Sequence, residues 1–143
     1  MIKSILITTD GSPLAELALD NGIALAKSLA AKVTVLIVEP VFPHFMIDVG
    51  FVKSAEFDIG VKALSKKTLE SAAARAAAAG VACETLAVSS DNVHQAIIDI
   101  ASSKRCDLIV MASHGRGGAS AVVLGSQTLK VLTHSKIPVL VYR

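Results

Sequence analysis

The chain has 143 residues, 52% of them hydrophobic and 18% charged, and its formal net charge is +2 at pH 7. This length and composition argue against intrinsic disorder and predict a single domain over residues 1–143 with a proper hydrophobic core. The small net charge argues against a nucleic-acid partner, no apolar run approaches the roughly 18–20 residues needed for membrane insertion, and residues 1–10 lack signal-peptide features.

The first part of the chain predicts two buried strands with a helix between them. Residues 2–9 are rich in β-branched side chains and apolar on both faces, which is typical of a central strand covered on both sides. Ser12 and Pro13 then begin a helix, because serine caps helices and proline suits the first helical position. A second buried strand is predicted at 33–39. The expected inward face of the helix comprises Leu14, Leu17, Ala18, Asn21, Leu25 and Leu29.

A long loop is predicted from Pro40 to Ser54. It contains three of the four phenylalanines, and long loops in compact domains are often lids or binding loops. The alternative, which we favour, is a surface excursion whose aromatic side chains form a small local core. The residues concerned are Phe42, Phe45, Met46 and Phe51.

The rest of the chain alternates between helices and strands. A helix is predicted from Phe57 through an alanine-rich block to Gly80, which is a typical stop residue. Its expected inward positions are Phe57, Val61, Leu64, Thr68 and Ala72. The remaining elements are a strand at 82–88, a helix that begins at Asp91 or Asn92, a strand at 108–112, a helix at 127–134 and a strand at 137–142, where Pro138 suggests an edge position.

This β-α alternation predicts an α/β fold in which a five-stranded parallel sheet carries helices on both faces. Ligands of such sheets bind beyond the carboxyl ends of the strands, at the point where the strand order reverses. Asp10 follows the first strand, and residues 113–118 follow the fourth. If those two strands are neighbours, the two segments face each other across one crevice.

The segment 107–126 is rich in glycine and serine and has an unusual charge balance. All 12 acidic residues lie at or before Asp107, and the only charged side chains beyond it are cationic: Arg116, Lys130, Lys136 and Arg143. Glycines allow close backbone approach, and N–H groups at a helix start attract anions. The segment therefore indicates a phosphate cradle, although an ordinary connector is the alternative.

Several catalytic and metal-binding motifs are excluded because the sequence lacks residues that they require. No GxxxxGK[ST] string occurs, and a GxGxxG match beginning at Gly115 ends in Ser120. A nucleophile elbow around Ser113 lacks its leading glycine and any later acid. The four histidines, His44, His94, His114 and His134, have no metal-ligand spacing, and His114 is expected to have a positioning role. Cys83 and Cys106 are expected to be reduced and buried, which fits a cytoplasmic location.

Three stretches together resemble the universal stress protein family. They are Thr9-Asp10-Gly11-Ser12 after the first strand, Met111-Ala-Ser-His-Gly115 followed by nine residues and Gly125-Ser126, and the closing stretch Ile137–Tyr142. The resemblance covers the whole chain. The nucleotide-binding branch of the family carries G-x-x-G, nine residues and G-[ST], and in this chain Ala112 replaces the first glycine. If that position requires positive φ or very close phosphate approach, affinity would fall.

The resemblance implies a Rossmann-like fold of the adenine nucleotide alpha hydrolase-like type, with strand order 3-2-1-4-5. It implies ATP, ADP or AMP across the ends of the first and fourth strands, with Asp10 near the ribose and phosphates or a Mg²⁺ ion, and the Val38 backbone at the adenine edge. It also implies a homodimer formed through Ile137–Tyr142. The binding residues it implies are Thr9, Asp10, Val38, Met111, Ala112, His114, Gly115, Gly125, Ser126 and Gln127. Arg116 is added to them as a candidate phosphate ligand because of its charge.

The leading functional hypothesis is a cytoplasmic stress-response regulator whose adenine-nucleotide state alters its interaction with a partner protein. Slow ATP hydrolysis is the second hypothesis, although the sequence has no P-loop lysine and no evident base for a γ-phosphate. A nucleotide-free dimeric scaffold is the third, because of Ala112. At the level of residues, Asp10 and Ser126 could instead be helix caps, and Arg116 could be an ordinary surface charge.

Overall fold

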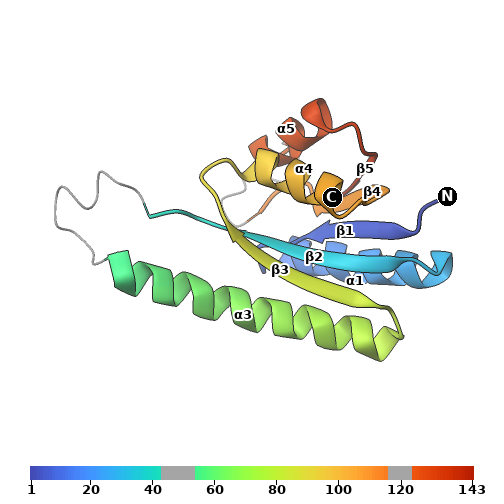
Figure 1. The fold of residues 1–143 in the computed structure, drawn as a ribbon, viewed down its shortest axis with the longest axis horizontal. Coiled ribbons are helices and arrows are strands. Elements are labelled where there is room, and N and C mark those ends of the chain that lie inside the picture. The colour runs from blue at the N-terminus through green and yellow to red at the C-terminus, as the bar shows by residue number, and fades with distance from the viewer. Residues whose placement is uncertain (43–53, 116–123) are drawn as a thin grey trace.

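The structure is a computed structural model that describes residues 1–42, 54–115 and 124–143 (Figure 1). Its described part contains a five-stranded sheet in which every neighbouring pair is parallel, in the order β3-β2-β1-β4-β5. The strands are β1 (Ser4–Thr8), β2 (Lys32–Glu39), β3 (Cys83–Ser89), β4 (Leu108–Ala112) and β5 (Val139–Tyr142). The helices are α1 (Pro13–Leu29), α3 (Ser54–Ala79), α4 (Val93–Ser103) and α5 (Ser126–His134). The predicted fold class and strand order are confirmed.

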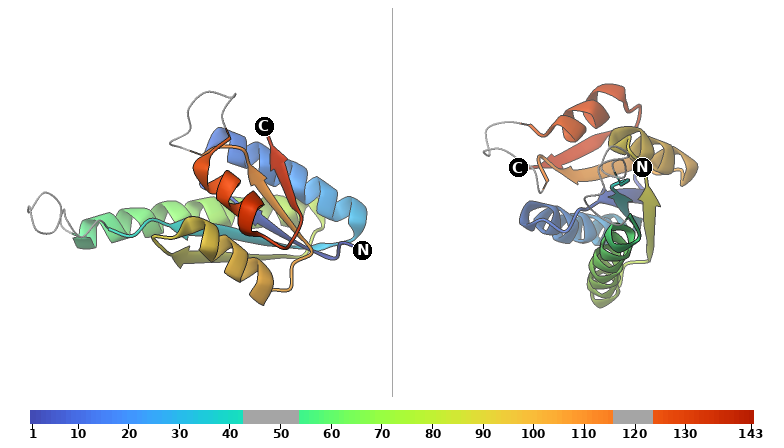
Figure 2. Two further views of the ribbon diagram at one scale, coloured as in Figure 1. Left: turned by 90° about the horizontal axis from the view of Figure 1, so that it is seen from above. Right: turned by 90° about the vertical axis from the view of Figure 1, so that its left-hand side faces the viewer.

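Helices cover both faces of the sheet, α1 and α3 on one and α4 and α5 on the other (Figure 2). Successive side chains of β1 pack alternately into the two helical layers. Ile5 and Ile7 pack in the layer of α1 and α3, whereas Leu6 packs in the layer of α4 and α5, and all three are fully buried. This two-sided burial explains why β1 is an almost continuous apolar run.

The first and fourth strands are neighbours, as the crevice hypothesis requires. Ile5 of β1 aligns with Leu108 of β4, and Thr8 at the end of β1 aligns with Leu36 of β2. Strand order therefore reverses at β1, and the segments that follow β1 and β4 leave the sheet at the same edge. The observed element boundaries lie within two residues of the predicted ones, except that α3 begins at Ser54, three residues before the predicted start at Phe57.

The predicted inward face of α1 is wrong in part. Its buried residues are Ala15, Ala18, Leu19, Gly22, Ile23 and Ala26, whereas Leu17 and Leu29 are 49% and 39% exposed. Small side chains let α1 lie close to the sheet: a Cβ atom on Gly22 would be only 2.6 Å from Cδ1 of Ile7. A prediction that followed the large leucines missed this face of mainly small residues.

The expected inward face of α3 is confirmed at Thr68 and Ala72, but Leu64 is 48% exposed and Ser65 is buried in its place. At the start of this helix, Phe57 contacts the buried Phe42 edge-to-face, with ring centroids 5.2 Å apart. This contact agrees with the small aromatic core that we favoured for the loop. Phe45, Met46 and Phe51 lie outside the described residues.

Both cysteines are free, Cys106 buried and Cys83 half-buried. Burial raises the pKa of both thiols above the ordinary value, and the neighbouring Glu84 carboxylate raises that of Cys83 further. Both are therefore thiols rather than thiolates at neutral pH. In the ranges that the structure describes, no helix is long and apolar enough to cross a membrane.

Candidate functional site

The turn between β1 and α1 is held by its own polar groups. The N–H of Thr9 donates to the carbonyl of Leu36 at 3.0 Å, which extends the pairing of β1 with β2 by one residue. Gly11 then adopts a φ of +76°, a conformation that favours glycine, and its N–H donates to Oγ1 of Thr9 at 3.1 Å. The chain therefore turns sharply at the edge of the sheet and presents Asp10 there.

Asp10 is not the cap of α1. The N-cap is Ser12, whose hydroxyl oxygen accepts from the N–H of Ala15 at 3.4 Å. Oδ1 of Asp10 instead accepts from the N–H of Ser12 at 2.9 Å, an arrangement typical of an Asx turn. The alternative reading of Asp10 as a helix cap is thus excluded, and the bond from Ser12 orients its carboxylate.

The Asp10 carboxylate lies directly against the segment that follows β4. A Cβ atom on Gly115 would overlap Oδ2 of Asp10 and lie 3.4 Å from its Cγ. The structure therefore brings together the two segments that the sequence placed on opposite sides of one crevice. It also gives a physical reason for glycine at position 115, because any side chain there would displace the carboxylate.

A second close approach occurs at the start of α5. The N–H of Gly125 donates to the carbonyl of Ser113 at 2.6 Å, and a Cβ atom on Gly125 would lie 2.8 Å from that oxygen and 3.2 Å from Cα of His114. The φ of Gly125 is −58°, so space rather than backbone conformation requires glycine. The tight contact fixes the start of α5 against the end of β4.

Gly125, rather than Ser126, is the N-cap of α5, and it has no side-chain capping bond. Ser126 occupies the first helical position with an exposed side chain, so its alternative role as the cap is wrong. The first N–H groups of a helix have no acceptor within it and carry the positive end of the helix dipole. The N–H groups of Ser126 and Gln127 therefore form an anion-attracting end on the β4 side of the crevice.

The backbone at the end of β4 is fixed by α5 and β5. The hydroxyl of Thr128 donates to the carbonyl of Ala112 at 2.9 Å, and the N–H of Ser113 donates to the carbonyl of Tyr142 at 2.6 Å. Ala112 lies in a regular strand and is not among the described residues with positive φ. Alanine in place of the family's glycine thus creates no backbone strain at position 112. The difference between the two residues there is the alanine methyl group.

Met111 and His114 flank this segment with different surroundings. The Met111 side chain is buried in the core between the sheet and helices α4 and α5, so this side chain does not line the crevice. Nδ1 of His114 lies 3.1 Å from Oγ of Ser113, and this contact holds the ring beside the end of β4. The positioning role expected for His114 stays a prediction.

The peptide group of Val38 points toward the same crevice. Backbone groups alternate in direction along a strand, and the carbonyl of Leu36 accepts from Thr9, whereas the carbonyl of Glu39 accepts from Ser90 on the β3 side. The N–H and C=O of Val38 therefore face the β1 side, beyond the last residue of β1. An incoming planar ligand could pair with both groups there.

Gln127 has a structural role that no local pattern predicted. Its side-chain Oε1 accepts from the N–H of His94 at 3.1 Å and so caps the first turn of α4. The rings of His94 and His134 also contact each other, with centroids 5.5 Å apart. These contacts tie α4 to α5 and give the Oε1 atom of Gln127 a structural partner. Arg116, the other predicted phosphate ligand, lies outside the described residues.

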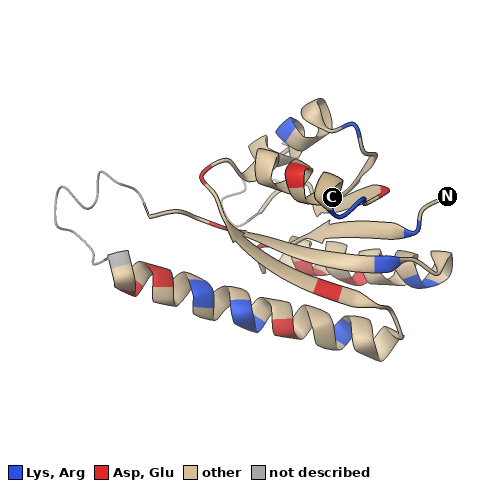
Figure 3. Ribbon diagram, in the orientation of Figure 1, with Lys and Arg blue, Asp and Glu red and all other residues tan. Residues whose placement is uncertain are grey.

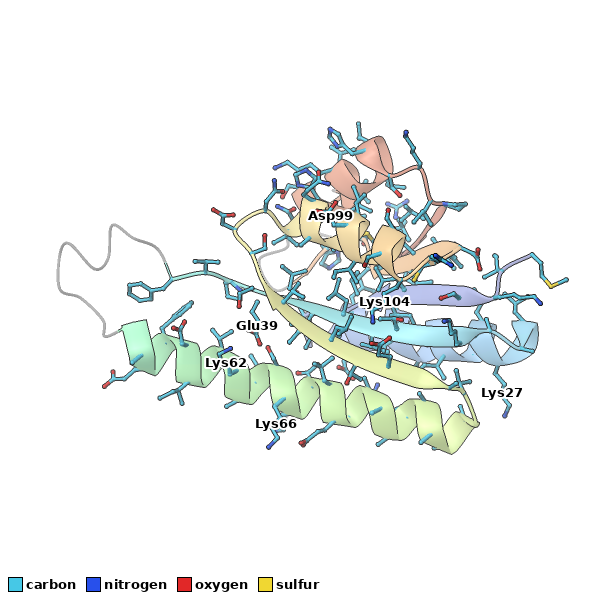
Figure 4. All side chains as sticks on the ribbon, in the orientation of Figure 1. Lys27, Glu39, Lys62, Lys66, Asp99 and Lys104 are labelled. Carbon is cyan, nitrogen blue, oxygen red and sulfur yellow. The ribbon has the colours of Figure 1, made fainter. Side chains whose placement is uncertain are left out.

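Sequence reasoning missed Glu39, a buried carboxylate at the carboxyl end of β2. Its Oε2 accepts from the hydroxyl of Ser89 at 3.2 Å and lies 4.0 Å from Nζ of Lys62 (Figure 4). Glu39 thus links the ends of β2 and β3 to α3, next to Val38. An acidic residue at the end of an otherwise apolar buried strand was the available signal.

The chemistry of the crevice suits a phosphorylated ligand. It combines N–H groups at a helix start, two glycines with no room for a Cβ atom and one oriented carboxylate. The described ranges contain no group of three or more His, Cys, Asp or Glu side chains that could hold a metal by itself. Asp10 alone could contribute to a Mg²⁺ site, since this ion often takes one or two carboxylates and completes its shell with phosphates and water.

Comparison with known proteins gives a consistent family signal. A model of the universal stress protein family matches residues 1–143. The universal stress protein YxiE of Bacillus subtilis (strain 168) is 35% identical over 150 aligned positions, which cover 100% of both chains.

Solved structures show the same fold. The protein MJ0577, a universal stress protein of Methanocaldococcus jannaschii, superposes with a TM-score of 0.83 at 30% identity, covering 99% of this chain and 96% of that one. A universal stress protein crystallised in complex with cAMP has a TM-score of 0.75 at 25% identity, with coverage of 99% and 97%.

Proposed function

Because the chain belongs to the universal stress protein family, we propose that it binds an adenine nucleotide in the crevice between the carboxyl ends of β1 and β4. The observation that carries the proposal is the meeting of Asp10 with Gly115 at the strand-order reversal, beside the start of α5. The relative crystallised with cAMP supports the adenine nucleotide class.

Each part of a nucleotide has a chemically suitable partner. The N–H groups of Ser126 and Gln127 would hold phosphate oxygens, and the Asp10 carboxylate would accept from ribose hydroxyls or bind Mg²⁺ between itself and the phosphates. The outward peptide group of Val38 would pair with the adenine edge. ATP, ADP and AMP all fit this description, because the phosphate contacts come from backbone groups.

We also propose that the protein is a cytoplasmic stress-response regulator that acts as a homodimer and whose nucleotide state changes its binding to a partner protein. The dimer part rests on β5, which is the last strand of the sheet and has no strand on its outer edge among the residues that the structure describes. Apolar side chains around it are exposed: Leu129 by 54%, Leu132 by 41% and Leu140 by 37%. The free thiols suit a reducing compartment. Size-exclusion chromatography coupled to light scattering measures the oligomeric state.

Mass spectrometry of ligand released from the purified protein, followed by calorimetric titration with ATP and AMP, tests nucleotide binding. We expect a co-purified adenine nucleotide, or a dissociation constant in the micromolar to millimolar range, with GTP as the control. Absence of both signals would refute the proposal. Phosphate release that is lost in an Asp10→Ala variant would support the hypothesis of slow ATP hydrolysis.

A further inference from the structure

A groove runs across the amino edge of the sheet, at the opposite end from the proposed nucleotide site. It consists of two adjoining hollows of about 430 Å³ and about 200 Å³, which share Lys32 and Ala82. The larger hollow lies where α1 and α3 end, and the smaller one lies beside the first residues of β3 and the end of α4. We call the two together the amino-edge groove. The side chains its argument needs are Lys27, Ala30, Lys32, Ala82, Cys83 and Lys104.

The floor of the amino-edge groove is apolar because the helix ends beneath it satisfy their own carbonyls. At the end of α1, Ala30 has a φ of +52° and the N–H of Ala31 donates to Ala26 O at 2.8 Å. At the end of α3, Gly80 has a φ of +73° and the N–H of Val81 donates to Ala76 O at 2.9 Å. Both ends are Schellman motifs, so small apolar side chains rather than free carbonyls line the larger hollow.

On the rim of the groove, cationic side chains outnumber acidic ones. Lys104 pairs with Glu84 at 2.5 Å, but Lys27 and Lys32 form no ion pair within the ranges that the structure describes. The positive charge of Lys27 interacts favourably with the helix dipole at the end of α1. Lys32 begins a strand and has no such helix-end role.

Further cations flank the rim. Lys3 lies beside the groove, because its carbonyl accepts from the N–H of Lys32 at 3.0 Å, and Arg105 directly follows Lys104. With the three rim lysines they make five cations against two carboxylates, Glu84 and Asp107, in a chain whose net charge is only +2 (Figure 3). Positive charge is therefore concentrated at this edge.

We propose that the amino-edge groove docks an acidic segment of a partner protein. Carboxylates of that segment would pair with Lys27 and Lys32, and its apolar side chains would lie on the alanine floor. Complementary charge of this kind steers association and selects the partner. A protein segment fits better than single-stranded nucleic acid, because the described residues that line the groove include no aromatic side chain on which bases could stack.

The docking proposal stands apart from nucleotide binding, because its residues lie at the other end of the sheet from Asp10 and Gly125. Cys83 lines the smaller hollow and is half-buried, whereas Cys106 is buried in the opposite layer. A thiol reagent at Cys83 therefore reports occupancy of the groove directly, and Cys106 is an internal reference.

The test uses a fluorescein-labelled peptide of alternating Glu and Leu and the full-length protein at low ionic strength. Fluorescence anisotropy measures binding to the wild type, to Lys27→Gln/Lys32→Gln and to Lys66→Gln/Lys67→Gln. The last variant is a matched control, because it removes the same charge from two exposed positions on α3, of which Figure 4 labels Lys66. Maleimide labelling of Cys83, mapped by mass spectrometry, is followed with and without peptide.

We expect the groove variant to lose about tenfold in affinity, since two partly exposed pairs of about 0.7 kcal/mol each correspond to one factor of ten. The α3 control should stay within about twofold of wild type, and peptide should slow labelling of Cys83. Absence of binding, equal loss in both variants, or unchanged Cys83 labelling would overturn the proposal. So would tighter binding of single-stranded DNA or of anionic phospholipid vesicles than of the peptide at the same groove.

Discussion

Replacing Gly115 by alanine should damage the nucleotide site while leaving the protein folded. The new Cβ atom would overlap Oδ2 of Asp10, which is already held through Oδ1 by the N–H of Ser12 at 2.9 Å. The carboxylate is the end of a short side chain, so it would rotate away. An off-rotamer shift of about 30° costs about 0.5–1.5 kcal/mol, against typical folding stabilities of about 5–15 kcal/mol.

The effect on ligand affinity should be larger than the effect on folding. A displaced Asp10 loses a hydrogen bond to a charged group, worth about 1.5–3 kcal/mol, which corresponds to about 10- to 150-fold in the dissociation constant for ATP. Calorimetry measures the affinity, and urea unfolding measures the stability. The control is Gly60→Ala, because Gly60 is an exposed residue of α3 with nothing within 4 Å of a new Cβ atom. If Gly115→Ala bound ATP like the wild type, the assigned role of the Asp10–Gly115 contact would be wrong.

Three further predictions concern stability and are measured by urea unfolding. Gly22→Ala should lower the free energy of unfolding by about 1 kcal/mol, because overpacking against Ile7 outweighs the gain in helix propensity. Gly60→Ala should raise the free energy of unfolding by about 0.5–1 kcal/mol. Equal shifts in the two variants would contradict the packing of α1. Ala30→Gly should stabilise by about 0.5–1 kcal/mol because φ is +52°, and destabilisation would refute the left-handed helix end. N–H groups of residues 3 and 4 lower the pKa of Asp107, so Asp107→Asn should destabilise the protein at pH 7. The difference from wild type should begin to shrink near the unfolded-state pKa of about 3.9 and vanish once the pH lies below the lowered pKa of the folded state; a difference that persists in stronger acid would contradict this.

The sheet was predictable because each strand carries a clear local signal. β1 and β2 are largely apolar, and the N-cap at Ser12 and the stop at Gly80 mark helix ends through the chemistry of single residues. The strand order came from the resemblance of the whole chain to a family. Packing faces were harder to predict: in α1 the face toward the sheet is marked by small residues, because close approach is what stabilises it.

The site was predictable where its residues belong to a short motif and less so where partners are distant in sequence. Asp10 and Gly115 were both expected in the crevice, but only the structure shows that each constrains the other. Gln127 pairs with the backbone of His94, and Glu39 pairs with Ser89, across separations that no periodicity reports. The charge pattern likewise drew attention to the basic end of the sequence, while the structure gathers its excess of cations at the amino edge of the sheet.

Backbone amide chemical shifts, measured by NMR during titration with ATP, test the central claim most directly. We predict that the largest changes occur at residues 10–12, at Val38 and at residues 125–127, which lie far apart in sequence and meet at one edge of the sheet. Changes confined to the amino-edge groove, or no changes at millimolar ATP, would contradict the placement of an adenine nucleotide between β1 and β4.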